Sequence, residues 1–180
     1  GSILFCWISA AVIALITLRK GVGNGAQLLL WALLPSGVLL YAVGDSGPLA
    51  LIVGTTALAM VLRTTVSLSL SVLTGIAVGA LSGLALVAFG GPYLEQMVTL
   101  FGDFLANLEQ QLSQGGDAVQ LPRPTAVQIA GMLGAGTGTM SILCLLLARY
   151  WQAALYNPGG FGSEFRLLRY TPAVATAMAL

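Results

Sequence analysis

Residues 66–90 read VSLSLSVLTGIAVGALSGLALVAFG and contain no charged side chain. Residues 125–148, which read TAVQIAGMLGAGTGTMSILCLLLA, are equally free of charge. A helix needs roughly 20 apolar residues to cross a bilayer, so both runs are long enough to span one. The sequence therefore predicts an integral membrane protein, and the rest of the chain is interpreted around these two runs.

Shorter apolar runs precede residues 66–90, and another begins near the end of the sequence. We expect an all-α, polytopic transmembrane helix bundle of about five full spans and a truncated sixth. The bundle should form one integral membrane domain over residues 1–180, and we expect it to be a fragment of a longer chain. The predicted spans are residues 3–18, 28–43, 49–62, 66–90, 125–148 and 172–180.

The composition agrees with a membrane protein. Charged residues make up 7% of the chain, against about 25% in an ordinary soluble domain. Hydrophobic residues make up 57%, and the mean hydropathy is +0.93. The net charge of +1 gives no basic field for nucleic acid. The sequence has no His, and Cys6 and Cys144 both lie in apolar runs, so neither a metal site nor a cofactor is expected.

Charges between the spans predict the orientation. Basic residues follow the first, third and fifth spans, and acidic residues dominate the alternate loops, so the basic loops should be cytoplasmic. Residue 1 then lies outside, and we expect a further span upstream. The expected location is the inner (plasma) membrane, crossed several times. The basic loops carry Arg19, Lys20, Arg63, Arg149, Arg166 and Arg169, and the outer loops carry Asp45, Glu95, Asp103, Glu109 and Asp117, with Arg123 as an exception.

Small residues recur every four positions along the fourth span, where they predict a ridge that another helix can approach closely. The fifth span offers a matching pair of glycines, so the two spans could pack together, or the ridge could contact another subunit. The glycine-rich run from Gly134 lacks the strand and the lysine of a nucleotide-binding loop. The predicted packing residues are Ser67, Ser71, Gly75, Gly79, Gly83, Gly134 and Gly138.

Two further elements leave alternatives open. Pro35, Ser36 and Gly37 should kink or break the second span, either for packing or to form a discontinuous helix that lines a site. Residues 92–113 have an apolar stripe and an acidic polar face, which predicts an amphipathic helix on the outer surface. This helix could rest at the membrane interface or act as a lid over an outer cavity.

The most distinctive segment is the predicted cytoplasmic loop, residues 149–171, which reads RYWQAALYNPGGFGSEFRLLRYT. Its Asn-Pro-Gly-Gly sequence predicts a tight turn, followed by a short helix that Ser163 could cap. The loop could simply set topology or could dock a partner. The candidate docking residues are Tyr156, Asn157, Pro158, Gly159, Gly160, Phe161, Arg166 and Arg169.

This stretch from Tyr156 to Arg169 resembles the YybS-like family of uncharacterised bacterial polytopic membrane proteins. That family is distantly similar to the substrate-binding membrane components of energy-coupling-factor transporters. The resemblance implies a small helical bundle that holds a ligand near its outer side and works with a membrane partner or an ATPase complex. It also implies that small residues of an early helix, such as Ala10 and Ala14, contact that partner.

Three classes of function remain. The first is a solute-binding or transport component that depends on a partner for energy, because the sequence has no nucleotide-binding motif. The second is a membrane scaffold or assembly factor without transport activity. An enzyme is the weakest hypothesis, because no His and no paired-carboxylate arrangement is available, and no catalytic residue is predicted. The candidate ligand-binding residues are Thr55, Thr56, Thr74, Gln128, Thr137 and Thr139.

Overall fold

The structure is a computed structural model that describes residues 2–113 and 120–166, and within these ranges it is all helical, as predicted. In this described part, α2, α3, α4 and α6 are long and apolar enough to cross a membrane. The structure therefore supports a polytopic membrane protein. The helices are α1 (Ser2–Lys20), α2 (Val22–Val43), α3 (Gly47–Thr65), α4 (Leu68–Phe89), α5 (Gly91–Ser113), α6 (Ala126–Tyr156) and α7 (Gly160–Arg166).

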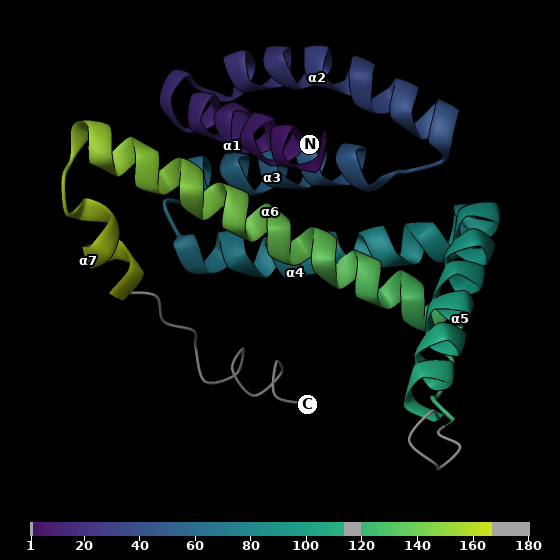
Figure 1. Cartoon of the computed structure of the whole chain (residues 1–180). Coiled ribbons are helices and arrows are strands. Elements are labelled where there is room, and N and C mark those ends of the chain that lie inside the picture. Colours follow the sequence, from purple (N-terminus) through teal and green to yellow (C-terminus); the bar gives the residue numbers. More distant parts are fainter. Residues whose placement is uncertain (1, 114–119, 167–180) are drawn as a thin grey trace.

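The helices form a layered bundle (Figure 1). α1 and α3 lie together in its middle, α2 lies outside them, and α6 crosses α4 on the opposite side. α5 stands across the end of α4 and α6. The core lies where α1, α3 and α6 meet, because Ala14, Leu58 and Leu145 are fully buried there. α2 is the least buried of the four long apolar helices.

The turn between α2 and α3 is built from short local hydrogen bonds. Gly44 ends α2 in the left-handed conformation (φ +73°), which glycine adopts without steric cost, and its N–H donates to the Leu40 carbonyl at 2.9 Å. The Gly47 N–H donates to Oδ1 of Asp45 at 2.8 Å, and Pro48 occupies the first turn of α3. The chain therefore reverses within a few residues and holds the Asp45 carboxylate at this end of the bundle.

Several helix ends differ from the predicted spans. α6 extends past the predicted membrane span at residues 125–148 and continues to Tyr156, because nothing in that stretch breaks a helix before Pro158. α4 begins at Leu68 rather than Val66, since Ser67 accepts a hydrogen bond from the Leu70 N–H at 3.3 Å and caps the helix.

Pro35 does not break α2, which is continuous from Val22 to Val43 and arches over α1 and α3 (Figure 1). The hydroxyl of Ser36 donates to the Ala32 carbonyl at 2.7 Å, within the same helix. Of the two alternatives, the discontinuous helix is therefore wrong for this described segment, and α2 is a continuous, curved helix.

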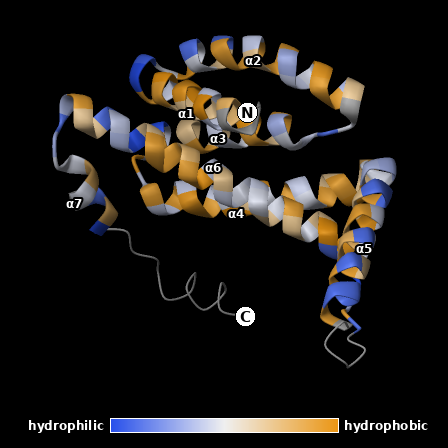
Figure 2. Cartoon of the chain, viewed as in Figure 1, coloured by the Kyte–Doolittle hydropathy of each residue, from blue (hydrophilic) through white to orange (hydrophobic). Residues whose placement is uncertain are grey.

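The two ends of the bundle carry different charges. One end, which we call the Arg63 end, contains the α1–α2, α3–α4 and α6–α7 turns. There Nη1 of Arg63 donates to the carbonyls of Thr17, at 3.3 Å, and of Leu18, so it satisfies the last carbonyls of α1. The other end, the Asp45 end, contains the α2–α3 and α4–α5 turns. Figure 2 shows polar residues collected on α5 and at the Arg63 end, with apolar residues between them.

The predicted orientation can be tested by cysteine labelling in a variant that carries Cys6→Ala and Cys144→Ala. We expect Gln110→Cys, on exposed α5, to react with an impermeant maleimide in intact cells. Asn157→Cys, exposed at the Arg63 end, should react only after permeabilisation, because basic ends of membrane bundles face the cytoplasm. The reverse labelling pattern would overturn the orientation.

Candidate functional site

A cavity of about 710 Å³ lies at the Asp45 end between α1, α2, α3 and α6, and we call it the Asp45 cavity. Its volume falls within the range of roughly 300–1,000 Å³ that is usual for pockets that bind drug-sized molecules. Its walls are mainly apolar. They are formed by Phe5, Cys6, Trp7, Ser9, Ala32, Pro35, Ser36, Leu39, Asp45, Gly47, Pro48, Leu51, Ile52, Met132, Leu133, Gly136, Thr137 and Met140.

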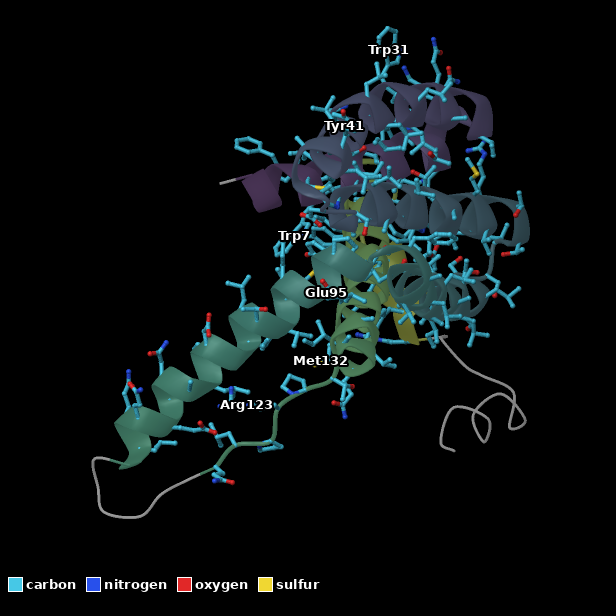
Figure 3. The ribbon with its side chains drawn as sticks, turned by 90° about the vertical axis from the view of Figure 1, so that its right-hand side faces the viewer. Trp7, Trp31, Tyr41, Glu95, Arg123 and Met132 are labelled. Carbon is cyan, nitrogen blue, oxygen red and sulfur yellow. The ribbon has the colours of Figure 1, made fainter. Side chains whose placement is uncertain are left out.

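Figure 3 looks toward the Asp45 end of the bundle and shows how its aromatic residues are arranged. Trp7, on α1, lies near the centre of this view, whereas Trp31 and Tyr41 belong to α2, and Trp31 points away from the bundle. Trp31 and Tyr41 are strongly exposed, at 67% and 95%. Trp7 lines the cavity, whereas Trp31 and Tyr41 lie on the outer surface.

The cavity has few polar groups, and several of them are already held by the backbone. The Ser36 hydroxyl donates to the Ala32 carbonyl, and the Thr137 hydroxyl donates to the Leu133 carbonyl at 3.0 Å. Both hydroxyl oxygens can therefore still accept a hydrogen bond from a ligand, but neither hydroxyl can donate one while its proton is bound to a helix carbonyl. Asp45 adds a carboxylate, which can only accept.

A second cavity of about 400 Å³ adjoins the first one between α3, α4 and α6. Asp45, Gly47, Leu133 and Thr137 line both cavities. Tyr93, in the first turn of α5, lines the second cavity, and its pKa is raised by burial and, to a smaller extent, by the Asp45 carboxylate. Asp45 is therefore a lining residue that the two cavities share.

Among the six predicted ligand-binding residues, Thr137 lines the Asp45 cavity. Gln128 lies at the start of α6, where its N–H donates to Oγ1 of Thr125 and its Oε1 accepts from the Thr125 N–H at 2.9 Å. This is a capping box, so the Gln128 side chain stabilises the helix end. Thr139 lies on another face of α6, in a groove beside α4.

The remaining three predicted residues lie apart from the Asp45 cavity. Thr56, on α3, donates to the Ile52 carbonyl at 2.7 Å, and Thr74, on α4, donates to the Leu70 carbonyl at 2.8 Å. Thr55 is fully buried, and its hydroxyl has no hydrogen-bond partner among the described residues. The structure therefore does not bring the six predicted residues together at one site.

The sequence indicates only a topological role for Asp45, as an acidic residue of an outer loop. The available signal was its position: it is the single charged residue between Lys20 and Arg63, and it directly precedes the Ser46-Gly47-Pro48 turn. An acidic residue at the first turn of a helix is normally read as a cap. Nothing in the sequence shows that α1 and α6 enclose a cavity beside it.

The seam between α4 and α6 brings the predicted packing glycines together. A Cβ atom added at Gly134 would lie 2.5 Å from the Gly79 carbonyl oxygen, and one added at Gly138 would lie 2.7 Å from that of Gly75. Gly83 faces the Ala130 carbonyl in the same way. The two backbones therefore touch, and Ser71 continues the buried ridge, whereas Ser67 caps α4.

A groove of about 600 Å³ runs beside this seam, and it is lined by α4 and α6. Among the described residues that line it, Thr139 alone has a polar side chain. Gly131 opens onto the groove with no other atom within 4 Å of its added Cβ. This chemistry suits lipid chains better than a polar solute.

Ala10 and Ala14, which the family resemblance implies for partner contact, are fully buried inside the bundle. Ala10 packs in a cluster with Leu51 and Ile52 of α3, and Ala14 packs in one with Leu58. Neither alanine can therefore reach a partner in this arrangement, and the implied contact is wrong for this conformation.

The predicted docking segment is divided between two helices. Tyr156 ends α6, Gly160 begins α7 after the turn at residues 157–159, and Arg166 ends α7. Arg149 joins the helices, because its Nε donates to Oε2 of Glu164 at 2.9 Å and its Nη2 donates to Oε1. Arg169 lies outside the described residues. The short helix thus begins before Ser163, the predicted cap.

Aromatic residues form an exposed surface on this segment. The rings of Tyr150 and Phe161 meet edge to face at 6.0 Å, and Phe165 stacks beyond Phe161 at 5.9 Å. The Arg19 guanidinium lies over the Tyr156 ring, 3.5 Å from its centre. Together with Asn157, Pro158 and Gly159, which are also exposed, these side chains cover the outside of the Arg63 end.

Within the described residues, no group of three or more His, Cys, Asp or Glu side chains is arranged to hold a metal ion. No protein-family model, no curated protein and no solved structure matches this chain. The geometry of the Asp45 cavity alone therefore identifies it as the candidate site.

Proposed function

We propose that the protein is a solute-binding or transport component of the inner membrane that depends on a partner for energy and is not an enzyme. The observation that carries this proposal is the Asp45 cavity, which combines the volume of a ligand pocket with apolar walls and a few polar groups. The sequence has no nucleotide-binding motif, which favours an ATPase complex as the partner.

The same proposal includes α1 as a fifth membrane span and residues 172–180, which lie outside the described residues, as the start of a sixth. α1 has 19 residues, and the segment before Arg19 is apolar. Membership of the YybS-like family, with its similarity to energy-coupling-factor components, is also part of the proposal. It rests on the sequence of the segment from Tyr156 to Arg169.

Two matched glycine substitutions in α6 test whether the Asp45 cavity binds a solute. Gly136 lines this cavity, and no other described atom lies within 4 Å of its added Cβ, so the Cβ of Gly136→Leu has room and its side chain should narrow the cavity. Gly131 has equal space but opens onto the groove beside α4, so Gly131→Leu is the control.

We expect a small molecule to copurify with the wild type and with Gly131→Leu in gentle detergent, and to be lost from Gly136→Leu. Mass spectrometry of extracts from the three purified proteins measures this. The same molecules in all three proteins, or none in any, would contradict solute binding at this cavity. An ATPase recovered with the protein would support the energy-supplying partner.

The exposed aromatic surface at the Arg63 end favours a second function, a membrane scaffold or assembly factor without transport activity. Tyr150, Tyr156 and Phe165 are each more than half exposed, and aromatic side chains are common at the centres of protein interfaces. Under this alternative, Tyr156→Ala with Phe165→Ala should remove copurifying envelope or assembly proteins, and Gly136→Leu should have no effect.

A further inference from the structure

The Asp45 carboxylate has no cationic partner in the part of the chain that the structure describes. The ion pairs there are Arg123 with Glu109, at 3.1 Å, and Arg149 with Glu164. Neither the Asp45 cavity nor the adjoining one is lined by Lys or Arg. The bond from the Gly47 N–H to Oδ1 satisfies one carboxylate oxygen, and this leaves Oδ2 available for a ligand.

Two further polar groups of the cavity favour the same charge on a ligand, whereas Ser9, which also lines it, carries a hydroxyl that can donate or accept. Ser36 and Thr137 have used their hydroxyl protons on helix carbonyls, so both present oxygen lone pairs. A negative ligand would meet the Asp45 carboxylate without a compensating cation, whereas a positive one would neutralise it.

The remaining walls of the cavity determine the chemical character of the rest of the ligand. Aliphatic side chains of α2, α3 and α6 surround the cavity, and α1 contributes the aromatic residues Phe5 and Trp7 to its wall. Apolar walls select an apolar body, and the faces of aromatic rings attract cations. A cavity of about 710 Å³ has room for such a molecule.

We propose that the Asp45 cavity binds a lipophilic organic cation, with its onium group against the Asp45 carboxylate and its apolar body among α1, α2, α3 and α6. The proposal names the substrate class of the site described above and so rests on the proposed function. Its key group is Asp45, and Ser36 and Thr137 assist as acceptors.

Two ions of nearly identical shape and opposite charge, tetraphenylphosphonium and tetraphenylborate, test this inference. Their binding to the purified full chain in lipid nanodiscs can be measured by equilibrium dialysis, with empty nanodiscs to subtract partition into lipid. We expect the wild type to bind the phosphonium at least about tenfold more tightly than the borate, as the loss of one charged contact would imply.

Asp45→Asn tests the carboxylate itself. The amide oxygen can still accept from the Gly47 N–H, so the turn should be retained. We expect about a tenfold loss of phosphonium affinity and no loss for the borate. Glu95→Gln is the matched control, because it removes the same charge from α5, where Glu95 lines neither cavity, and it should bind like the wild type.

The outcomes separate this inference from the proposed function. Equal affinity for both ions, or phosphonium binding that survives Asp45→Asn, would overturn the choice of a cation and leave solute binding intact. Absence of binding of either ion would also overturn it. Solute binding itself is decided separately by the molecules that copurify with Gly131→Leu but not with Gly136→Leu.

Discussion

Replacing Gly134 with leucine should lower the free energy of unfolding by about 3 kcal/mol, a large effect for one residue. Its first added carbon would lie 2.5 Å from the Gly79 oxygen and 2.8 Å from the Gly83 Cα. These are backbone atoms, so relief requires α4 and α6 to separate along their whole seam. Unfolding by sodium dodecyl sulfate in mixed micelles, followed by circular dichroism, measures the change.

Gly131→Leu is the control for helix propensity and added bulk, because Gly131 lies one turn earlier in α6 and has open space at its Cβ position. We expect this variant to be at least as stable as the wild type, since leucine favours a helix over glycine by about 1 kcal/mol. Equal stability of Gly134→Leu and Gly131→Leu would show that the close approach of α4 and α6 is wrong.

Replacing Thr55 with valine should raise the free energy of unfolding by about 1–2 kcal/mol. The Thr55 hydroxyl is fully buried and has no hydrogen-bond partner within residues 2–113 and 120–166, so its desolvation is not compensated there. Valine has nearly the same shape and removes that polar group. The same unfolding titration in mixed micelles measures the gain.

Thr56→Val provides the matched control in the next residue of α3. Thr56 is also buried, but its hydroxyl donates to the Ile52 carbonyl at 2.7 Å, so removal of this bond should leave stability unchanged or lower it. If Thr55→Val lost as much stability as Thr56→Val, the Thr55 hydroxyl would have to form a hydrogen bond in the membrane-embedded protein, which would contradict this prediction.

The seam between α4 and α6 was accessible to sequence reasoning because its physical cause is local. Residues four apart lie on one face of a helix, and small side chains on that face permit close approach of another backbone. The spacing of Gly75, Gly79 and Gly83 therefore predicts the contact surface of α4 directly. The pairing with Gly134 and Gly138 was one of two open alternatives, and the structure shows it within this chain.

The site was less accessible, because chemical type does not specify where a side chain points. Hydroxyls in membrane helices often donate to their own backbone, and Thr56, Thr74 and Thr137 do so here. Thr137 alone among the predicted residues also lines the Asp45 cavity. Thr137 lines the cavity because of how α6 is rotated about its axis relative to α1 and α2. The sequence of α6 alone does not specify this rotation.

The apolar runs predict membrane spans and do not give the ends of the helices. Arg149 lies just past the fifth apolar run, but a charged residue ends a span only where it meets water, and it does not interrupt backbone hydrogen bonding. Here the guanidinium pairs with Glu164 of α7, and α6 continues to Tyr156.

α2 forms one wall of the Asp45 cavity through Ala32, Pro35, Ser36 and Leu39, yet it is the least buried of the four long apolar helices and lies on the outside of the bundle. A membrane around the bundle would therefore be separated from the cavity by this single helix. A lipophilic molecule reaches such a wall by dissolving in the bilayer first and diffusing sideways within it. Its arrival rate would then depend on its partition coefficient, so the membrane itself would act as the reservoir from which the cavity fills.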